Sequence, residues 1–332
     1  MTLRDLKLYC RALGHNEFHG DQIFKWIYYR LADDFDEMTD VPKNLREKLE
    51  NIFLLNYLKP HKTLTSHDKS TIKYSFLLER DTGIEAVVLF DKNNRTSFCI
   101  SSQAGCPIGC IYCATGKMGF IRNLTDGEII NEVFSLIKLH KKPDSVLFMG
   151  MGEPLLNYNN VTRAIELLQS AHIGAKKITV STCGIVKKIY DLGLSGLRPR
   201  LAVSIGSAIE EKRKKIIPLS KDNDLQSLKK AIRFYREKTR RRVSIEYTLV
   251  RGINDTVSDA RALAAFARHT GTHVNIIRFN PAAGTDLSVP DKGTASKVKR
   301  ILKESGIEVS ERYRRGTDIN AACGQLVSHR KK

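Results

Sequence analysis

The first sixty residues carry apolar side chains at helical spacing in three short stretches. Apolar residues recur every three or four positions from Leu3 to Leu13, which is typical of one face of an amphipathic helix. Similar stretches follow Gly20 and Pro42, and proline suits the first turn of a helix. The pattern predicts an N-terminal helical domain over residues 1–60. Its basic faces suit RNA binding and are equally compatible with solvent.

The apolar period changes to two from about residue 71. Polar and apolar residues then alternate, and two stretches rich in turn residues interrupt them. The predicted strands are 71–76, 84–90 and 96–101. The pattern therefore predicts a short β-meander extension over residues 61–97.

From residue 98 onward, apolar strands alternate with amphipathic helices. A capping box formed by Thr125 and Glu128 predicts the start of one helix. The further strands are predicted at 145–149, 178–182, 201–205, 243–250 and 274–279. This alternation is typical of parallel strands with crossover helices. We expect an α/β fold, a partial (βα)6 barrel over residues 98–332, whose lateral opening could admit a macromolecule.

The charge balance indicates a polyanionic partner. The chain has 55 Lys and Arg against 36 Asp and Glu, a net charge of +19, and such an excess favours nucleic acid. Two basic runs, 212–215 and 236–242, are candidate phosphate contacts. A basic protein without such a partner is the alternative. We find no apolar run of about 20 residues that could span a membrane and no signal peptide, so we expect a cytoplasmic protein.

Three of the seven cysteines are closely spaced. Cys106, Cys110 and Cys113 form a C-x3-C-x2-C motif within QAGCPIGCIYCATGKMGF. Thiolates hold iron–sulfur clusters, and a cubane normally takes four, so three would leave one iron open to a substrate. This spacing is typical of radical SAM enzymes. A zinc site remains an alternative, although it would need a fourth Cys or His nearby, and the nearest histidines, His67 and His140, are distant in sequence.

Polar and glycine residues recur where the predicted barrel strands end. They are Gly150 to Pro154, Ser181, Ser204, Gly206 and Asn280. Folds of this kind bind ligands at the carboxyl ends of their strands. We therefore expect a pocket for an adenosyl group there.

Three further residues are candidates for chemistry. Cys323 lies among small residues in GTDINAACGQL, where it could be a mobile, reactive cysteine or an inert buried thiol. Glu85 is a lone carboxylate in an apolar strand, and Cys99 precedes the first motif cysteine by seven residues. Taken alone, Glu85 would lie on a solvated face and Cys99 in the core.

At this point the chain resembles the RlmN family of radical SAM RNA methyltransferases, which methylate adenine C2, and its relative Cfr, which methylates C8. The resemblance covers nearly the whole length. It is carried by DQIFKWIYYRLADDFDEMTD, FCISSQAGCPIGCIYCATGKMGF, MGMGEPLLN, ITVSTCG, IRFNP and GTDINAACGQL. MGMGEPLLN is closer to RlmN, because the Cfr pattern lacks the proline.

The resemblance implies cofactors, partners and site residues. The cofactors are one [4Fe–4S] cluster per chain and S-adenosyl-L-methionine. The partners are large-subunit ribosomal RNA, tRNA next to the anticodon, and an electron donor such as a flavodoxin or ferredoxin. The implied metal ligands are Cys106, Cys110 and Cys113, and the implied cofactor contacts are Gly152, Glu153, Ser181, Ser204, Ile205, Gly206 and Asn280. Gly206 departs from the family, which usually has Ser-Leu-His at this strand end.

The family mechanism reverses the polarity of the methyl group, because adenine C2 is itself electrophilic. Cys323 would accept a methyl group from one cofactor molecule, and a 5′-deoxyadenosyl radical from a second would remove hydrogen from it. The resulting carbon radical would add to the ring. Glu85 would act as the base, and Cys99 would release the product through a transient disulfide with Cys323. The adenine has to be unstacked to react, so an RNA loop or an unfolded fragment is the expected substrate.

Three alternatives remain from the sequence. One is a Cfr-like C8 methyltransferase. Another is a radical SAM enzyme with a different substrate, which the glycine at position 206 would favour. The third is a non-catalytic RNA-binding protein with a structural metal.

Overall fold

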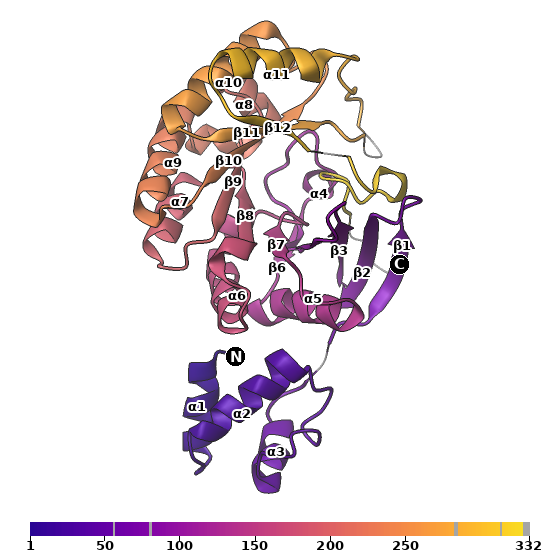
Figure 1. Ribbon diagram of the computed structural model, residues 1–332, viewed down its shortest axis with the longest axis vertical. Helices are drawn as coiled ribbons and strands as arrows, with labels where there is room; N and C mark the ends of the chain where they lie inside the picture. Colours follow the sequence, from indigo (N-terminus) through magenta and orange to yellow (C-terminus); the bar gives the residue numbers. More distant parts are fainter. Residues whose placement is uncertain (56, 80–81, 282–284, 313, 328–332) are drawn as a thin grey trace.

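A single ten-stranded sheet runs through most of the molecule. The computed structural model describes residues 1–55, 57–79, 82–281, 285–312 and 314–327. Within them the strand order is β1-β2-β3-β4-β7-β8-β9-β10-β11-β12. Figure 1 shows the sheet, with a helical part below it that contains the N-terminus.

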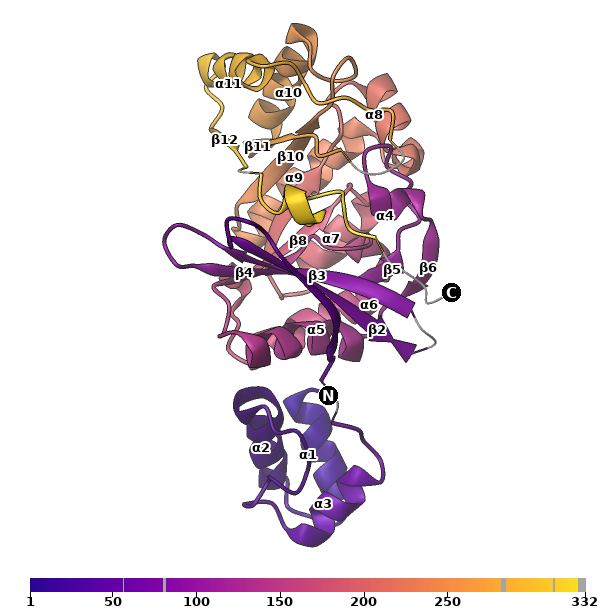
Figure 2. The same cartoon turned by 90° about the vertical axis from the view of Figure 1, so that its right-hand side faces the viewer.

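The helical part comprises α1 (Leu3–Ala12), α2 (Phe18–Lys25), a π-helical turn (Trp26–Arg30) and α3 (Lys43–Glu50). Thr2 and Asp5 form a capping box at the start of α1, which satisfies two backbone N–H groups that the helix leaves unpaired. The helical part contacts the barrel through Tyr28 and Phe134, whose ring centroids are 5.2 Å apart. It lies beneath α5 in Figures 1 and 2.

The first four strands are antiparallel neighbours. They are β1 (Pro60–Thr65), β2 (Thr71–Leu78), β3 (Thr82–Phe90) and β4 (Thr96–Cys99). β4 then pairs in parallel with β7. The meander and the barrel therefore share one continuous sheet.

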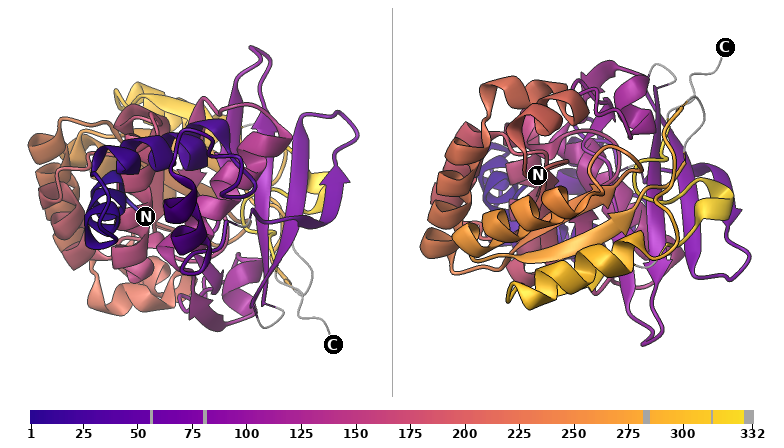
Figure 3. Two further views of the ribbon diagram at one scale, coloured as in Figure 1. Left: turned by 90° about the horizontal axis from the view of Figure 1, so that it is seen from below. Right: turned by 90° about the horizontal axis from the view of Figure 1, so that it is seen from above.

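The remaining strands of the large sheet are parallel. They are β7 (Ser145–Phe148), β8 (Ile178–Thr182), β9 (Arg200–Ser204), β10 (Val243–Leu249), β11 (His273–Arg278) and β12 (Val309–Glu311). Their helices are α5 (Asp126–Leu139), α6 (Tyr158–Ser170), α7 (Val186–Leu194), α8 (Glu210–Ile216), α9 (Leu225–Thr239), α10 (Val257–Thr270) and α11 (Thr294–Glu304). Helices cover the outer side of the sheet (Figure 3). The predicted α/β partial barrel with a helical N-terminal part is confirmed, whereas β1, α8 and β12 were not predicted.

The cysteine motif lies between two short strands. β5 (Gln103–Gly105) and β6 (Phe120–Asn123) form a separate antiparallel pair, and α4 (Ala114–Lys117) lies between them in the chain. No helix in the described ranges is both long and apolar enough to cross a membrane.

Candidate active site

A cavity of about 160 Å³ lies at the carboxyl ends of the parallel strands. Cys106, Cys110 and Cys113 line one side of it, and residues from the ends of β7 to β11 line the others. Parallel sheets place their ligands at this end of the strands. The motif and the polar strand ends, which are far apart in sequence, therefore meet at one site.

Main-chain hydrogen bonds hold the cysteine loop in place. The N–H of Cys106 donates to the carbonyl of Gly119 at 2.9 Å, and that of Ile111 donates to Ile216 of α8 at 3.1 Å. Burial raises the pKa of the Cys106 thiol to about 12 and also raises the pKa values of Cys110 and Cys113. Binding of iron would therefore release protons from these thiols.

In the described part of the chain, no three His, Cys, Asp or Glu side chains are placed to hold a single metal ion. The three thiols instead stand around the same cavity. The thiolates of a cubane bind separate irons, so they need not meet at one point.

Four of the seven predicted cofactor contacts line this cavity: Gly152, Glu153, Ser181 and Ser204. The carboxylate of Glu153 accepts hydrogen bonds from the N–H groups of Leu155 at 3.0 Å and Cys183 at 2.8 Å. It thereby joins the ends of β7 and β8. Burial raises its pKa, although these hydrogen bonds oppose the shift.

The other three predicted contacts are placed differently. Ile205 is fully buried in the core, and neither it nor Gly206 is among the residues that line the cavity. Asn280 borders a neighbouring cavity, and its buried Oδ1 has no hydrogen-bond partner within the described chain. Asn280 Oδ1 is thus a candidate to accept a hydrogen bond from a polar group of a bound molecule.

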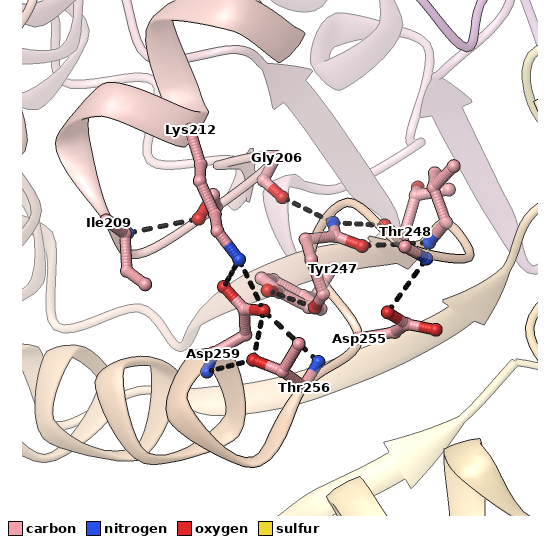
Figure 4. A network of polar contacts seen from close by, with 12 residues as sticks. Gly206, Ile209, Lys212, Tyr247, Thr248, Asp255, Thr256 and Asp259 are labelled. Carbon is pink, nitrogen blue, oxygen red and sulfur yellow. Dashed lines mark hydrogen bonds and ion pairs between the residues drawn. The ribbon is translucent and has the colours of Figure 1, made fainter.

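Gly206 belongs to a network of polar contacts that includes residues of α8 and α10 (Figure 4). Its carbonyl accepts a hydrogen bond from Asn254 Nδ2 at 2.7 Å. Its φ is +66°, and a Cβ there would lie 2.9 Å from Ile216 Cγ2 and 3.1 Å from Ile217 Cδ1. The side chains of α8 therefore occupy the space that the family's usual histidine would need.

The sequence reasoning missed Glu246 and Arg312, which also line the cavity. Arg312 Nε lies 3.2 Å from Glu246 Oε2, and Arg312 Nη1 donates to Met149 Sδ at 3.3 Å. Burial alone would lower the pKa of Arg312, but Glu246 together with Cys323 and Cys99 outweighs burial, and the pKa is raised. A lone glutamate in the apolar run of β10 was the signal that could have drawn attention to this pair.

A second cavity, of about 220 Å³, adjoins the first. Cys323, Cys113 and Arg312 line both cavities, and Cys99 lines only the second. Burial raises the pKa of the Cys99 thiol well above its usual range, whereas Cys323 is exposed. The structure thus brings together the two cysteines that the resemblance paired.

In this structure Cys99 and Cys323 are free thiols, so the transient disulfide that the resemblance implies is not present in it. Two hydrogen bonds hold the loop that carries Cys323. The carbonyl of Gly324 accepts a hydrogen bond from Ala114 N at 2.7 Å, and that of Leu326 accepts one from Thr115 Oγ1 at 2.7 Å. The loop is therefore fastened to the cysteine motif (Figure 2).

Glu85 is buried on β3, and not on a solvated face. Its carboxylate lies 3.0 Å from Lys73 Nζ and accepts a hydrogen bond from the N–H of Val327 at 3.0 Å. Lys73 Nζ also donates to the carbonyl of Asn320 at 3.1 Å. This ion pair holds both sides of the loop that carries Cys323, and Glu85 does not line either cavity.

Three of the four residues of the first basic run are paired or buried, and Lys215 is exposed. Lys212 binds the buried carboxylate of Asp259 at 2.7 Å, and Lys214 lies 3.2 Å from Glu211. Arg213 is fully buried. In the second run, Arg242 is exposed but is paired with Glu308 at 2.7 Å.

The chain matches known proteins along almost its whole length. Residues 1–55 match the family described as ribosomal RNA large subunit methyltransferase N-terminal domain, and residues 100–266 match the radical SAM superfamily. A probable dual-specificity RNA methyltransferase RlmN of Thermotoga sp. is 41% identical over 98% of this chain and 96% of the relative. The dual-specificity RNA methyltransferase RlmN of Syntrophotalea carbinolica is 38% identical over 98% and 88%.

Among solved structures, a radical SAM methyltransferase from Sphaerobacter thermophilus aligns with a TM-score of 0.92 and 37% identity, covering 98% of this chain and 97% of that one. The fold and the cysteine-lined cavity define the class of protein: the chain is a radical SAM enzyme. More particularly, it belongs to the RlmN family of dual-specificity RNA methyltransferases. A non-catalytic RNA-binding protein is therefore not supported.

Proposed function

We propose that this chain methylates C2 of an adenine in large-subunit ribosomal RNA, and in tRNA next to the anticodon, through a methylated cysteine. The observation that carries the proposal is the position of Cys323, which lies between the cavity of the cysteine motif and the cavity of Cys99. At this position the sulfur of Cys323 can face a cofactor in the first cavity and a nucleotide in the second. Family membership favours this reading over a C8 methyltransferase or a different substrate.

The residues of the first cavity fit the cofactors of the superfamily. Cys106, Cys110 and Cys113 supply three thiolates for a [4Fe–4S] cluster, and hydroxyl groups from β8 and β9 face the same space. A side chain at Gly152 would collide with Gln103, since the added carbon would lie 2.5 Å from its Cβ. Gly152 therefore lets the end of β7 pack against Gln103, and the backbone held there borders the cavity.

When bound, the cluster and S-adenosyl-L-methionine supply a methyl group and a radical that removes hydrogen. Cys323 accepts the methyl group, because its thiol is exposed at the boundary of the two cavities. The second cavity takes the adenine, and Arg314 and Arg315, two of the three arginines that line it, are the candidates for contact with RNA phosphates. Its volume and partly apolar lining suit a base that has left its stack.

We assign Cys99 to product release. Its sulfur bonds to that of Cys323 while the bond from the Cys323 sulfur to the methylene carbon breaks; the electron pair stays on that carbon, which takes up a proton to become the methyl group, and Cys99 loses its thiol proton. Burial raises the pKa of the Cys99 thiol. Glu85, which the resemblance implies as the base, lines neither cavity and is paired with Lys73; we assign it to fastening the loop at Val327. The partners are RNA and a one-electron donor of the flavodoxin or ferredoxin class.

The test is the variant Cys323→Ala, with Cys10→Ala as control because Cys10 is buried in α1, away from both cavities. We expect Cys323→Ala to leave RNA unmethylated and to carry no methyl group itself, as shown by mass spectrometry of nucleosides and peptides. Chromatography separates 2-methyladenosine from 8-methyladenosine. RNA methylation by Cys323→Ala, or 8-methyladenosine from the unaltered enzyme, would overturn the proposal.

Cys99→Ala gives a second result. Without the releasing thiol, we expect RNA to remain covalently attached to the protein, and a denaturing gel would show a slowly migrating species. Its absence, with turnover at the unaltered rate, would remove Cys99 from the mechanism.

A further inference from the structure

Arg213 is a fully buried guanidinium that the proposed mechanism does not use. It lies on α8, and its exposed fraction is 0%. It donates from Nη2 to the carbonyl of Cys183 at 3.0 Å and from Nη1 to the carbonyl of Asn223. Its buried Nε has no hydrogen-bond partner within the described chain.

The charge on Arg213 is not balanced by a carboxylate in contact. In the ranges that the structure describes, no carboxylate oxygen lies within 4.0 Å of it. Glu210 instead accepts the N–H of Leu225, and Asp224 caps α9 through Ser227. Arginine stays protonated in proteins, and an uncompensated buried charge is costly.

Burial lowers the pKa of Arg213, and the carboxylates of Glu210 and Asp224 oppose this shift only from a distance. Glu153 lies on the other side of the Cys183 peptide, where it accepts that residue's N–H at 2.8 Å. The nearest carboxylates therefore compensate the guanidinium only in part.

The residue whose carbonyl Arg213 binds, Cys183, also borders the cavity of the cysteine motif. Cys183 lines the cavity together with Cys106 and Cys110, and the three pack in one group with Ile216 and Ile217 of α8 and its C-terminal end. α8 also accepts the N–H of Ile111 from the cysteine loop. A single residue therefore separates the guanidinium from the place where three thiolates would hold the cluster.

We propose that Arg213 is the buried counter-charge of the cluster and makes the cluster easier to reduce. The inference rests on the cluster of the proposed function. Reduction adds one electron to the cluster, and no bond on the protein forms or breaks. A nearby fixed positive charge stabilises the more negative, reduced form, since cluster potentials depend on the charges and hydrogen bonds around them.

The space around Arg213 is built for a guanidinium. A Cβ at Gly184 would lie 3.2 Å from Arg213 Nη2, and Gly184 has a φ of +102°. The chain therefore turns closely around this side chain after β8. The rival explanation is that Arg213 only holds the turn after β8 in place. The test therefore has to separate the effect of the Arg213 charge from that of its side-chain shape.

The experiment measures the midpoint potential of the cluster in anaerobically reconstituted full-length protein, by dithionite titration followed by electron paramagnetic resonance. Arg213→Gln keeps a hydrogen-bond donor but removes the charge, and Arg213→Lys keeps the charge but loses the planar fork. Arg300→Met is the matched control, because it removes a positive charge from an exposed site on α11.

We expect Arg213→Gln to lower the equilibrium constant for reduction about tenfold, a shift of about 59 mV to more negative potential. Arg213→Lys and Arg300→Met should keep the unaltered potential. An unaltered potential in an iron-loaded Arg213→Gln protein would overturn the inference. If Arg213→Gln takes up no iron, the Arg213→Lys variant decides the matter. A fully iron-loaded Arg213→Lys protein with the potential of the unaltered protein would support the counter-charge. A shifted potential in that variant would refute it. Absence of iron from the unaltered chain would instead defeat the proposed function.

Discussion

At the residue scale, the ion pair of Lys73 and Glu85 shows how a charged group in an apolar strand can be explained only by its distant partner. Both side chains are buried, and each also binds the main chain of the C-terminal loop. From the sequence, a lone glutamate in β3 would lie on a solvated face. Lys73 comes within reach only because β2 and β3 pair, and it lies diagonally, since Ser75 is directly opposite Glu85; the two residues could therefore not be matched beforehand.

Removal of one member of this pair should destabilise the protein strongly. Lys73→Met leaves Glu85 buried without a counter-charge, and such a loss costs about 3–5 kcal/mol. We expect a lower midpoint of urea denaturation in the cluster-free protein. The double variant Lys73→Met/Glu85→Leu should recover most of this loss, because two well-packed apolar residues can replace a buried pair. Equal destabilisation by the single and double variants would contradict this account.

At the element scale, local signals in the sequence located most helices and strands. The Thr125 and Glu128 capping box is present at the start of α5, since it depends only on residues three positions apart. α8 was missed because its seven residues are mostly charged and were interpreted as a phosphate-binding run. β1 was missed because it is an edge strand with few apolar residues, and only its pairing with β2 defines it.

The cap of α5 predicts a dependence of stability on pH. Burial would raise the pKa of Glu128, but hydrogen bonds from Arg122 and from the N–H of Thr125 lower it overall. A carboxyl whose folded pKa is depressed stabilises the protein fully above its unfolded pKa, 4.5, and loses that contribution as the pH falls towards the folded value. The thermal midpoint of Glu128→Gln should therefore lie below that of the unaltered protein at pH 7 and approach it at pH 3.

The control for this comparison is Glu237→Gln, on the exposed side of α9. Its midpoint should follow that of the unaltered protein at both pH values. A constant difference between Glu128→Gln and the unaltered protein from pH 7 to pH 3 would disprove the linkage.

Gly206 gives a second prediction for an element, the turn after β9. Gly206 and Gly252 have similar φ angles, +66° and +71°, but a Cβ at Gly252 would meet no atom within 4 Å. Both alanine variants therefore carry the same backbone strain, and only Gly206→Ala also collides with Ile216. We expect Gly206→Ala to be less stable than Gly252→Ala by about 1–3 kcal/mol in urea denaturation. Equal stabilities would mean that α8 can move aside.

At the scale of the whole molecule, the alternation of strands and helices was enough to predict a partial barrel of six strands. It could not show that the antiparallel strands extend the same sheet, because the pairing of β4 with β7 joins segments 48 residues apart (Ser97 with Ser145). The site was likewise predictable where a motif is contiguous, as for the three cysteines. Arg312 and Glu246 meet only in three dimensions.

The net charge of +19 predicts that RNA affinity depends steeply on salt. Binding of cations to phosphates releases counterions, and about six such contacts cost roughly a thousandfold in affinity between 50 and 200 mM salt. Filter binding of an RNA loop fragment over this range would measure the slope. An affinity independent of salt would mean that the excess charge serves another purpose.

The attachment of the Cys323 loop has a consequence for shortened forms of the chain. Its bonds at Leu326 and Val327, to Thr115 and Glu85, lie beyond the cysteine itself. A premature stop codon just after Gly324 would preserve every sulfur atom that the chemistry requires. The encoded protein would nevertheless lose the two hydrogen bonds that hold the Cys323 sulfur in position. We expect it to be inactive although all of its reactive groups are present.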